Sequence, residues 1–290
     1  MNPVFDAVRS GELDKALALS ENGVRENPSC PLARGLLADI LMIRGDFERA
    51  ETHLGAVLRF DPSQQREIDS LMQLLRAECD RQQVFAEGRT PEFLTPPTES
   101  MKLRLGALAN IRSGDAATAH GMLAEAQRIE PEYVAIANAG EPAPFLDWDA
   151  RFGATLEALS ATGKYYWIPL SSVLSIEFAP VRTLRDLAWR SAVVTLGDSA
   201  RPPVADAGAS ANVAFVFLPT RYPGSETSTD GAVRAGGATE WTEPAPGVGI
   251  GVGQRVYLHG ESPLAAVSLS HVAVASGDGV ASGGAGKVGR

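Results

Sequence analysis

The chain has 290 residues, an ordinary globular content of apolar and charged residues, and a formal net charge of −9 at pH 7. Its length corresponds to about two domains. The acidic balance argues against nucleic acid as a partner, because phosphate backbones are bound by clustered positive charge. The N-terminus has no basic stretch followed by an apolar block, and no apolar run is long enough to span a membrane. We therefore expect a cytoplasmic protein with no membrane contact.

Two N-terminal stretches, "SGELDKALALS" and "RGDFERAETHL", share a pattern of Gly, acid, apolar residue, base and Ala. Their spacing is about 34 residues, which is the period of tetratricopeptide repeats. Small residues let paired helices approach closely, while Gly ends one helix and Asp caps the next. The positions that recur at this spacing are Gly11 and Gly45, Ala16 and Ala50, and Pro28 and Pro62.

A third copy is the stretch "RSGDAATAHGMLAEAQRIEP", in which Gly114, Ala119 and Pro131 have the same relative spacing. Between the copies we expect a degenerate repeat, formed by one long helix over 64–86 and then the loop "EGRTPEFLTPPTES". Residues 1–135 are therefore predicted to form a tetratricopeptide-like helical domain. An ordinary bundle of amphipathic helix pairs is the alternative.

From Ala135 the composition changes. "NAGEPAPF" is typical of a linker, and a helix is expected over 149–160. The segment "TLRDLAWR" predicts one or two helical turns, while "DSARPPVADAGASA" and "EPAPGVGIGVG" predict loops. The sequence predicts a mostly β domain over 145–275 and a disordered Gly/Ser-rich tail over 276–290, which makes the fold α+β. The expected strands lie in "KYYWIPL", "SVLSIEF", "SAVVTLG", "NVAFVFLP", "QRVYLHG" and "LAAVSLSHVAVA".

The chain lacks the motifs of common catalytic and metal sites. It has four histidines but no HExxH pair, no GxSxG nucleophile elbow and no GxxxxGK[ST] phosphate loop. "GVGIGVG" fails the dinucleotide pattern because Val252 occupies the position of the last Gly. Cys30 and Cys79 have no CxxC context and are expected to pack as small apolar residues. We expect no catalytic residues, no metal and no cofactor.

Aromatic clusters remain to be explained, among them Tyr165, Tyr166 and Trp167, and also Tyr222 with Trp241. Packing in the core and sheet is the first explanation for these clusters. The second is an anchor surface for a protein partner, because Trp, Tyr and Arg are enriched where binding energy is concentrated.

The order of these features, with "KYYWIPL", "LRDLAWRSA", "LPTRYPGSE" and "GVGQR" behind a short repeat region, resembles the ImpE/TagJ family, also called the SciE type. This resemblance extends from about Ala16 to Val274, and "YYWIP" and "RYPGSE" are its most specific parts. The chain departs from it at Trp148, which interrupts the acids before Arg151.

The resemblance implies a non-catalytic accessory protein of the bacterial type VI secretion system. Its implied partner is the N-terminal helix of the small, TssB-like subunit of the contractile sheath, and it implies assistance to a ClpV-type AAA+ ATPase. Repeat geometry suggests that Val8, Arg9, Asp39 and Met42 line a partner groove, with core packing as the rival for Val8 and Met42. The other candidate partner-binding residues come from the motifs and are Tyr165, Tyr166, Trp167, Arg221, Tyr222 and Glu226.

Two alternatives belong to other functional classes. One is a hydrolase or transferase whose site lies in the β-rich half near Glu226. A deep pocket holding Glu226 beside a perturbed His or Lys would favour it, whereas a flat aromatic surface would favour binding. The other alternative is a general repeat-type chaperone that accepts many clients.

Overall fold

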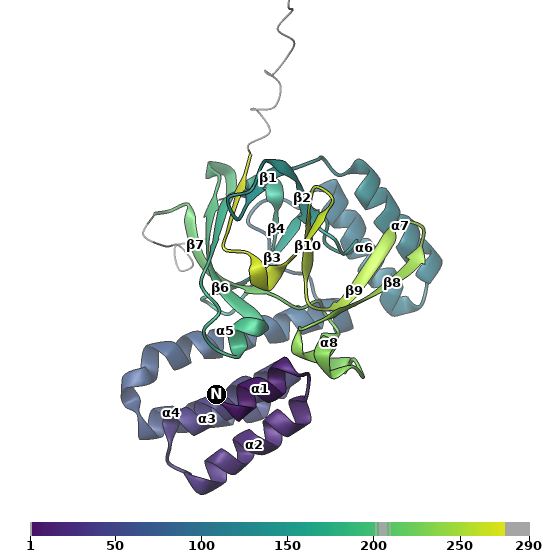
Figure 1. Ribbon diagram of the computed structural model, residues 1–290. Helices are drawn as coiled ribbons and strands as arrows, with labels where there is room; N and C mark the ends of the chain where they lie inside the picture. The colour runs from purple at the N-terminus through teal and green to yellow at the C-terminus, as the bar shows by residue number, and fades with distance from the viewer. Residues whose placement is uncertain (1, 201, 203–207, 209, 276–290) are drawn as a thin grey trace, which may run out of the picture.

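The computed structural model describes residues 2–200, 202, 208 and 210–275. The helices of residues 3–87 lie below a curled sheet in this view, and the helices over 99–129 lie beside the sheet (Figure 1). The predicted tail 276–290 and positions 201, 203–207 and 209 of the predicted loop over 198–211 lie outside the described residues. The N-terminal helices are α1 (Pro3–Arg9), α2 (Leu13–Glu26), α3 (Pro31–Arg44), α4 (Phe47–Phe60), α5 (Gln65–Glu87), α6 (Glu99–Ser113) and α7 (Ala116–Ile129).

The helix ends follow the repeat signals. Gly45 ends α3 at φ +82°, and the Asp46 carboxylate accepts a hydrogen bond from the Arg49 amide at the start of α4. The same arrangement recurs at Gly114, which has φ +83°, and at Asp115, whose side chain caps α7. A left-handed glycine followed by a capping carboxylate closes one helix and opens the next within two residues. The long helix predicted over 64–86 is confirmed by α5 to within one residue.

Within the described residues, ten strands form one antiparallel sheet in the order β11-β10-β2-β1-β12-β5-β6-β7-β3-β4. The predicted α+β class is confirmed, and all six sequence runs expected to form strands contain one or more. These strands are β1 (Val134–Ala137), β2 (Ala143–Asp147), β3 (Thr155–Ser160), β4 (Tyr165–Pro169), β5 (Val173–Phe178), β6 (Trp189–Leu196), β7 (Val213–Pro219), β10 (Val256–His259), β11 (Ser262–Ala265) and β12 (His271–Val274).

The helix predicted over 149–160 is wrong, because residues 148–154 form a turn and β3 follows. Every residue of β3 is buried, so the alternation that identifies a half-buried strand is missing. Its Leu, Glu and Ala residues favour helix in isolation, and tertiary pairing with β4 and β7 overrides this preference.

Two segments assigned to irregular chain also belong to sheets. The predicted linker "NAGEPAPF" contains the β1–β2 turn and the first residues of β2. The predicted loop "EPAPGVGIGVG" lies in a hairpin of β8 (Thr239–Ala245) and β9 (Val248–Gly253). Packing requires two of its glycines, since a Cβ on Gly251 would lie 2.6 Å from the Tyr222 ring and one on Gly253 would lie 2.1 Å from the Ala238 carbonyl oxygen. The "TLRDLAWR" segment supplies one 3-10 turn, η3 (Arg185–Leu187), before β6 begins.

One hydrophobic cluster joins the helices to part of the sheet, and a second cluster lies within the sheet region itself. The largest apolar cluster joins residues of α1–α6 to Leu159 of β3, Trp167 of β4 and Trp189 of β6. The prediction that both cysteines pack as apolar residues is wrong for Cys79, which is exposed, and Cys30 is only half-buried. The proposed division at 135 and 145 stays a prediction, although β1 already begins at Val134.

A buried carboxyl lies where the helices meet the sheet region. Asp39 of α3 is 6 % exposed, and its Oδ1 lies 3.3 Å from Nη1 of Arg185 in η3. Burial raises the pKa of Asp39 to about 7, with Asp186 and Glu67 acting in the same direction and Arg185 opposing them. The ionised form is therefore disfavoured in the folded protein relative to the unfolded chain.

We expect Asp39→Asn to change how stability depends on pH. A folded-state pKa above the unfolded one means that the unfolded chain binds fewer protons between pH 4 and 7, so the stability of the wild type falls as pH rises through that window. The variant lacks this contribution. Its stability relative to the wild type should rise by about 2 kcal/mol between pH 5 and pH 8. Urea unfolding at both pH values measures the difference, and parallel pH profiles of the two proteins would contradict it.

Candidate functional site

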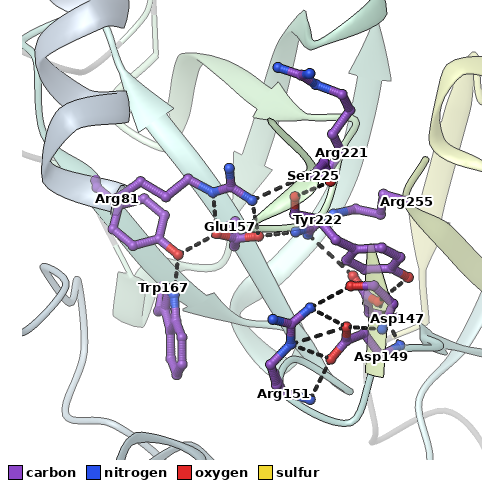
Figure 2. Close-up of polar contacts among 12 residues, drawn as sticks. Arg81, Asp147, Asp149, Arg151, Glu157, Trp167, Arg221, Tyr222, Ser225 and Arg255 are labelled. Atoms are coloured by element: carbon purple, nitrogen blue, oxygen red, sulfur yellow. Dashed lines mark hydrogen bonds and ion pairs between the residues drawn. The ribbon is translucent and has the colours of Figure 1, made fainter. Parts of the chain in front are cut away.

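A buried polar network connects α5 to the sheet, with Glu157 of β3 at its centre (Figure 2). Arg81 of α5 donates from Nε to Glu157 Oε1 at 2.7 Å and from Nη2 to Oε2 at 3.3 Å. Arg255 pairs with Oε2 from the other side, and the Tyr165 hydroxyl donates to Oε1. Trp167 in turn donates from its indole nitrogen to the Tyr165 hydroxyl. One carboxylate therefore contacts two guanidinium groups that come from distant parts of the chain.

Arg255 extends the network to Asp147 at the end of β2. Its Nη1 lies 3.2 Å from Asp147 Oδ2, and neither side chain has measurable solvent exposure. The Tyr222 hydroxyl donates to Asp147 Oδ1 at 2.9 Å and accepts from the Val256 amide at 3.1 Å. Burial raises the pKa of Asp147 to about 6, although Arg255 opposes this shift. Burial also raises the pKa of Tyr222, so its phenol stays protonated and available as a donor.

A second carboxylate fixes the turn 148–154 against the β8–β9 hairpin. Asp149 receives Arg151 in a forked pair, with Nη2 donating to Oδ2 at 2.6 Å and Nε donating to Oδ1 at 2.9 Å. The Gly251 amide donates to Asp149 Oδ2 at 2.8 Å, and the Gly251 carbonyl accepts from Arg151 at 2.7 Å. The forked guanidinium–carboxylate pair orients both side chains, and the two bonds with Gly251 attach the turn to β9.

Arg221 and Glu78 join α3 and α5 to the sheet region. The Arg221 guanidinium donates to the Ile43 carbonyl of α3 at 3.0 Å and to the Arg234 carbonyl at 2.5 Å. Burial lowers the pKa of Arg221 to about 10. Glu78 of α5 accepts from the Trp189 indole nitrogen at 2.8 Å. These bonds show that the motif residues hold the helical region and the sheet in one arrangement.

The turn that follows β7 is fixed by a serine. Ser225 is 1 % exposed, and its hydroxyl donates to the Tyr222 carbonyl at 2.5 Å and accepts from the Gly253 amide at 2.7 Å. Its hydrogen-bonding capacity is therefore used by backbone groups, and within the part of the chain that the structure describes its hydroxyl has no hydrogen bond to a basic side chain. The next residue, Glu226, is half-buried.

A surface groove of about 380 Å³ lies between α5, α6 and this turn, and we refer to it as the junction groove. Apolar side chains from both helices line it together with the charged ends of network residues. Cavities of this size accommodate a few side chains of a ligand or partner. The residues that line it are Glu78, Arg81, Gln82, Phe85, Ala86, Leu108, Ile111, Arg151, Pro223, Gly224 and Glu226.

The four residues suggested by repeat geometry lie in different environments. Val8 and Met42 are 1 % and 0 % exposed and lie in the shared core, which matches the rival explanation for them. Asp39 is buried against Arg185, while Arg9 is exposed. These four positions do not line one open surface. Their role in partner binding stays a prediction, and the side chains of Val8, Asp39 and Met42 are too buried to contact a partner in this arrangement.

The motif residues come together, but mostly in the interior. Tyr165, Tyr166, Trp167 and Tyr222 are each at most 5 % exposed, which corresponds to core and sheet packing and not to a flat aromatic surface. Arg221 is 8 % exposed. Glu226 is the most accessible of the candidate motif residues, and the groove that it lines contains neither His nor Lys.

Sequence reasoning missed the residues that organise this site, chiefly Glu78, Arg81, Glu157 and Arg255. The one available signal was a charged residue within an otherwise apolar run, as in "TLEALS" around Glu157. Buried charges are rare unless they are paired, so such a residue points to an unseen partner. The partner of Glu157 is 76 positions away in α5, and no local pattern identifies it.

The described residues contain no group of three or more His, Cys, Asp or Glu side chains placed to hold a metal ion. No helix in this part of the chain has both the length and the apolar character needed to cross a bilayer.

Comparison with known proteins gives two family matches. A family model described as "ImpE protein" matches residues 141–273, and a "Tetratricopeptide repeat" model matches residues 7–75. The second match confirms the nature of the N-terminal helix pairs. The first covers the sheet region, including the polar network apart from its α5 residues.

Two individual proteins are similar over most of the chain. A Pseudomonas aeruginosa protein named "Type VI secretion system accessory component TagJ" is 33 % identical over 258 residues, covering 87 % of this chain and 84 % of that protein. A crystal structure of a Vibrio parahaemolyticus protein superposes with a TM-score of 0.80 at 22 % identity, covering 94 % of this chain and 98 % of the other. The second likeness concerns the fold alone.

Proposed function

Because this chain belongs to the ImpE/TagJ family, we propose that it is a non-catalytic accessory protein of the bacterial type VI secretion system. In this role it binds, in the cytoplasm, the N-terminal helical segment of the small subunit of the contractile sheath. By holding this segment it assists the recruitment of a ClpV-type ATPase to the sheath.

The observation that supports binding is the junction groove. Apolar side chains of α5 and α6 line it, and it is edged by a turn that the buried network fixes in place. A preformed groove between rigid elements suits a helical segment, because little conformational entropy is lost at the binding surface on docking. The buried charges beneath it are engaged in ion pairs and hydrogen bonds, which is the arrangement of a structural support.

The expected result is saturable binding of the full chain to a synthetic peptide of the N-terminal segment of the cognate small sheath subunit. Isothermal titration measures it, with a scrambled peptide of the same composition as control. The full chain is used because one hydrophobic cluster joins the helices to part of the sheet. Absence of heat in the titration, together with failure of the peptide to co-migrate with the protein in gel filtration, would contradict the proposal.

A further inference from the structure

We propose that the junction groove selects a protein segment that presents an apolar side chain next to a lysine or arginine, and that Glu226 is the residue that determines this selectivity. The proposal rests on the binding role proposed above in one respect, because it takes the ligand to be a protein segment. It specifies the side chains that the groove recognises, whichever protein supplies them.

The first step of the argument is charge. The other charged groups that line the groove are engaged in ion pairs within the protein. Arg81 pairs with Glu78 and Glu157, and Arg151 pairs with Asp149. Among the charged side chains that the structure describes in this lining, Glu226 is the one with neither a hydrogen bond nor an ion pair.

The carboxylate of Glu226 is not used by the fold around it. The nearby guanidinium of Arg221 feels its charge but donates to the carbonyls of Ile43 and Arg234. Its side-chain stem lies beside Gly45, since a Cβ placed there would be in ordinary contact with Glu226 Cγ at 3.7 Å. Every other polar residue of "RYPGSE" is held by hydrogen bonds, so Glu226 is the member of the motif left free to contact a partner.

The second step is the apolar floor. Phe85 of α5 is half-buried, and Leu108 and Ile111 come from one face of α6. Ile111 is 41 % exposed, which is high for a large apolar side chain beside a groove. An inserted apolar side chain would cover this surface and remove it from water.

The two features together specify the ligand. Inserting a neutral or acidic segment would bring Glu226 out of water without a compensating charge, which opposes binding. A lysine or arginine near the apolar anchor would pair with Glu226 at the rim of the groove. The net charge of −9 on the chain further favours the approach of a basic segment.

The test is a selection with a phage-displayed library of random dodecapeptides against the full chain. We expect enriched peptides with an apolar residue and a lysine or arginine within four positions. Their affinity should fall about tenfold for Glu226→Gln and further for Glu226→Lys, measured by fluorescence anisotropy. Ile111→Asn should lower the affinity for the same peptides. Circular dichroism verifies that each variant is folded.

The matched control is Glu240→Lys, which makes the same charge change at an exposed position of β8. It should leave the affinity within twofold of the wild type. Replacing the basic residue of a selected peptide with glutamate should restore binding to Glu226→Lys but abolish binding to the wild type. Selection of peptides without a basic residue, no enrichment at all, or equal affinities for wild type and Glu226→Gln would each overturn the proposal.

This experiment separates the two proposals. If the library yields groove-dependent peptides and the sheath-subunit peptide does not bind, the proposed partner is wrong and the groove chemistry stands. If the sheath peptide binds equally to wild type and Glu226→Lys, the proposed function stands and the groove assignment is wrong.

Discussion

Replacing Glu157 with alanine is expected to lower the free energy of unfolding by about 3–5 kcal/mol. Glu157 is fully buried and compensates Arg81 and Arg255, both of which are themselves buried. Without it, two guanidinium groups and the Tyr165 hydroxyl lose their shared acceptor in an interior that water does not reach. Because Arg81 belongs to α5 and Arg255 precedes β10, the loss weakens the attachment of the helices to the sheet.

Urea unfolding followed by circular dichroism measures this effect. The matched control is Glu125→Ala, which removes the acid of an exposed pair with Arg128, whose side chain is 70 % exposed. Exposed pairs of this kind contribute less than about 0.5 kcal/mol. Equal and small changes for the two variants would show that the buried network does not hold the structure together.

Gly253→Ala is expected to destabilise the protein by about 3 kcal/mol. Gly253 has φ +95°, and a Cβ there would lie 2.1 Å from the carbonyl oxygen of Ala238. The backbone would have to move, and with it the amide that donates to Ser225. Since Ser225 fixes the turn that carries Glu226, the variant should also bind ligands of the junction groove more weakly.

Gly247→Ala is the control for backbone conformation alone. Gly247 belongs to the same hairpin and has φ +75°, but no atom lies within 4 Å of a Cβ placed on it. Gly247→Ala should lower the free energy of unfolding only by the cost of placing alanine in the left-handed region, about 1 kcal/mol. Chemical denaturation of both variants compares them, and a cost for Gly253→Ala no larger than that for Gly247→Ala would show that the hairpin absorbs the contact.

Local signals in the sequence were sufficient for the elements whose ends are set by neighbouring residues. Gly45 with Asp46, and Gly114 with Asp115, mark helix boundaries through backbone conformation and capping, which depend on a few adjacent positions. The antiparallel strands were also predictable where short runs are rich in β-branched residues, as in β6. These features do not require knowledge of the rest of the chain.

Elements whose stability comes from distant partners were predicted wrongly. β3 looked helical because both of its faces are covered, and the covering residues come from other segments. The β8–β9 hairpin looked like a loop because its glycines fit against Tyr222 and Ala238, contacts that composition does not reveal. The motif aromatics could be assigned to core or to surface with equal chemical logic until their burial was known.

By itself, the sequence determined the repeat register, the α+β order of the chain, and the motifs that resemble one family, because each depends on short-range spacing. Only the tertiary structure decided that those motifs form a buried network and that Glu226 is left unpaired beside an apolar groove. The physical reason is separation along the chain. Glu157 meets Arg81 across 76 positions and Arg255 across 98, and charges so far apart become partners only when the sheet closes against α5.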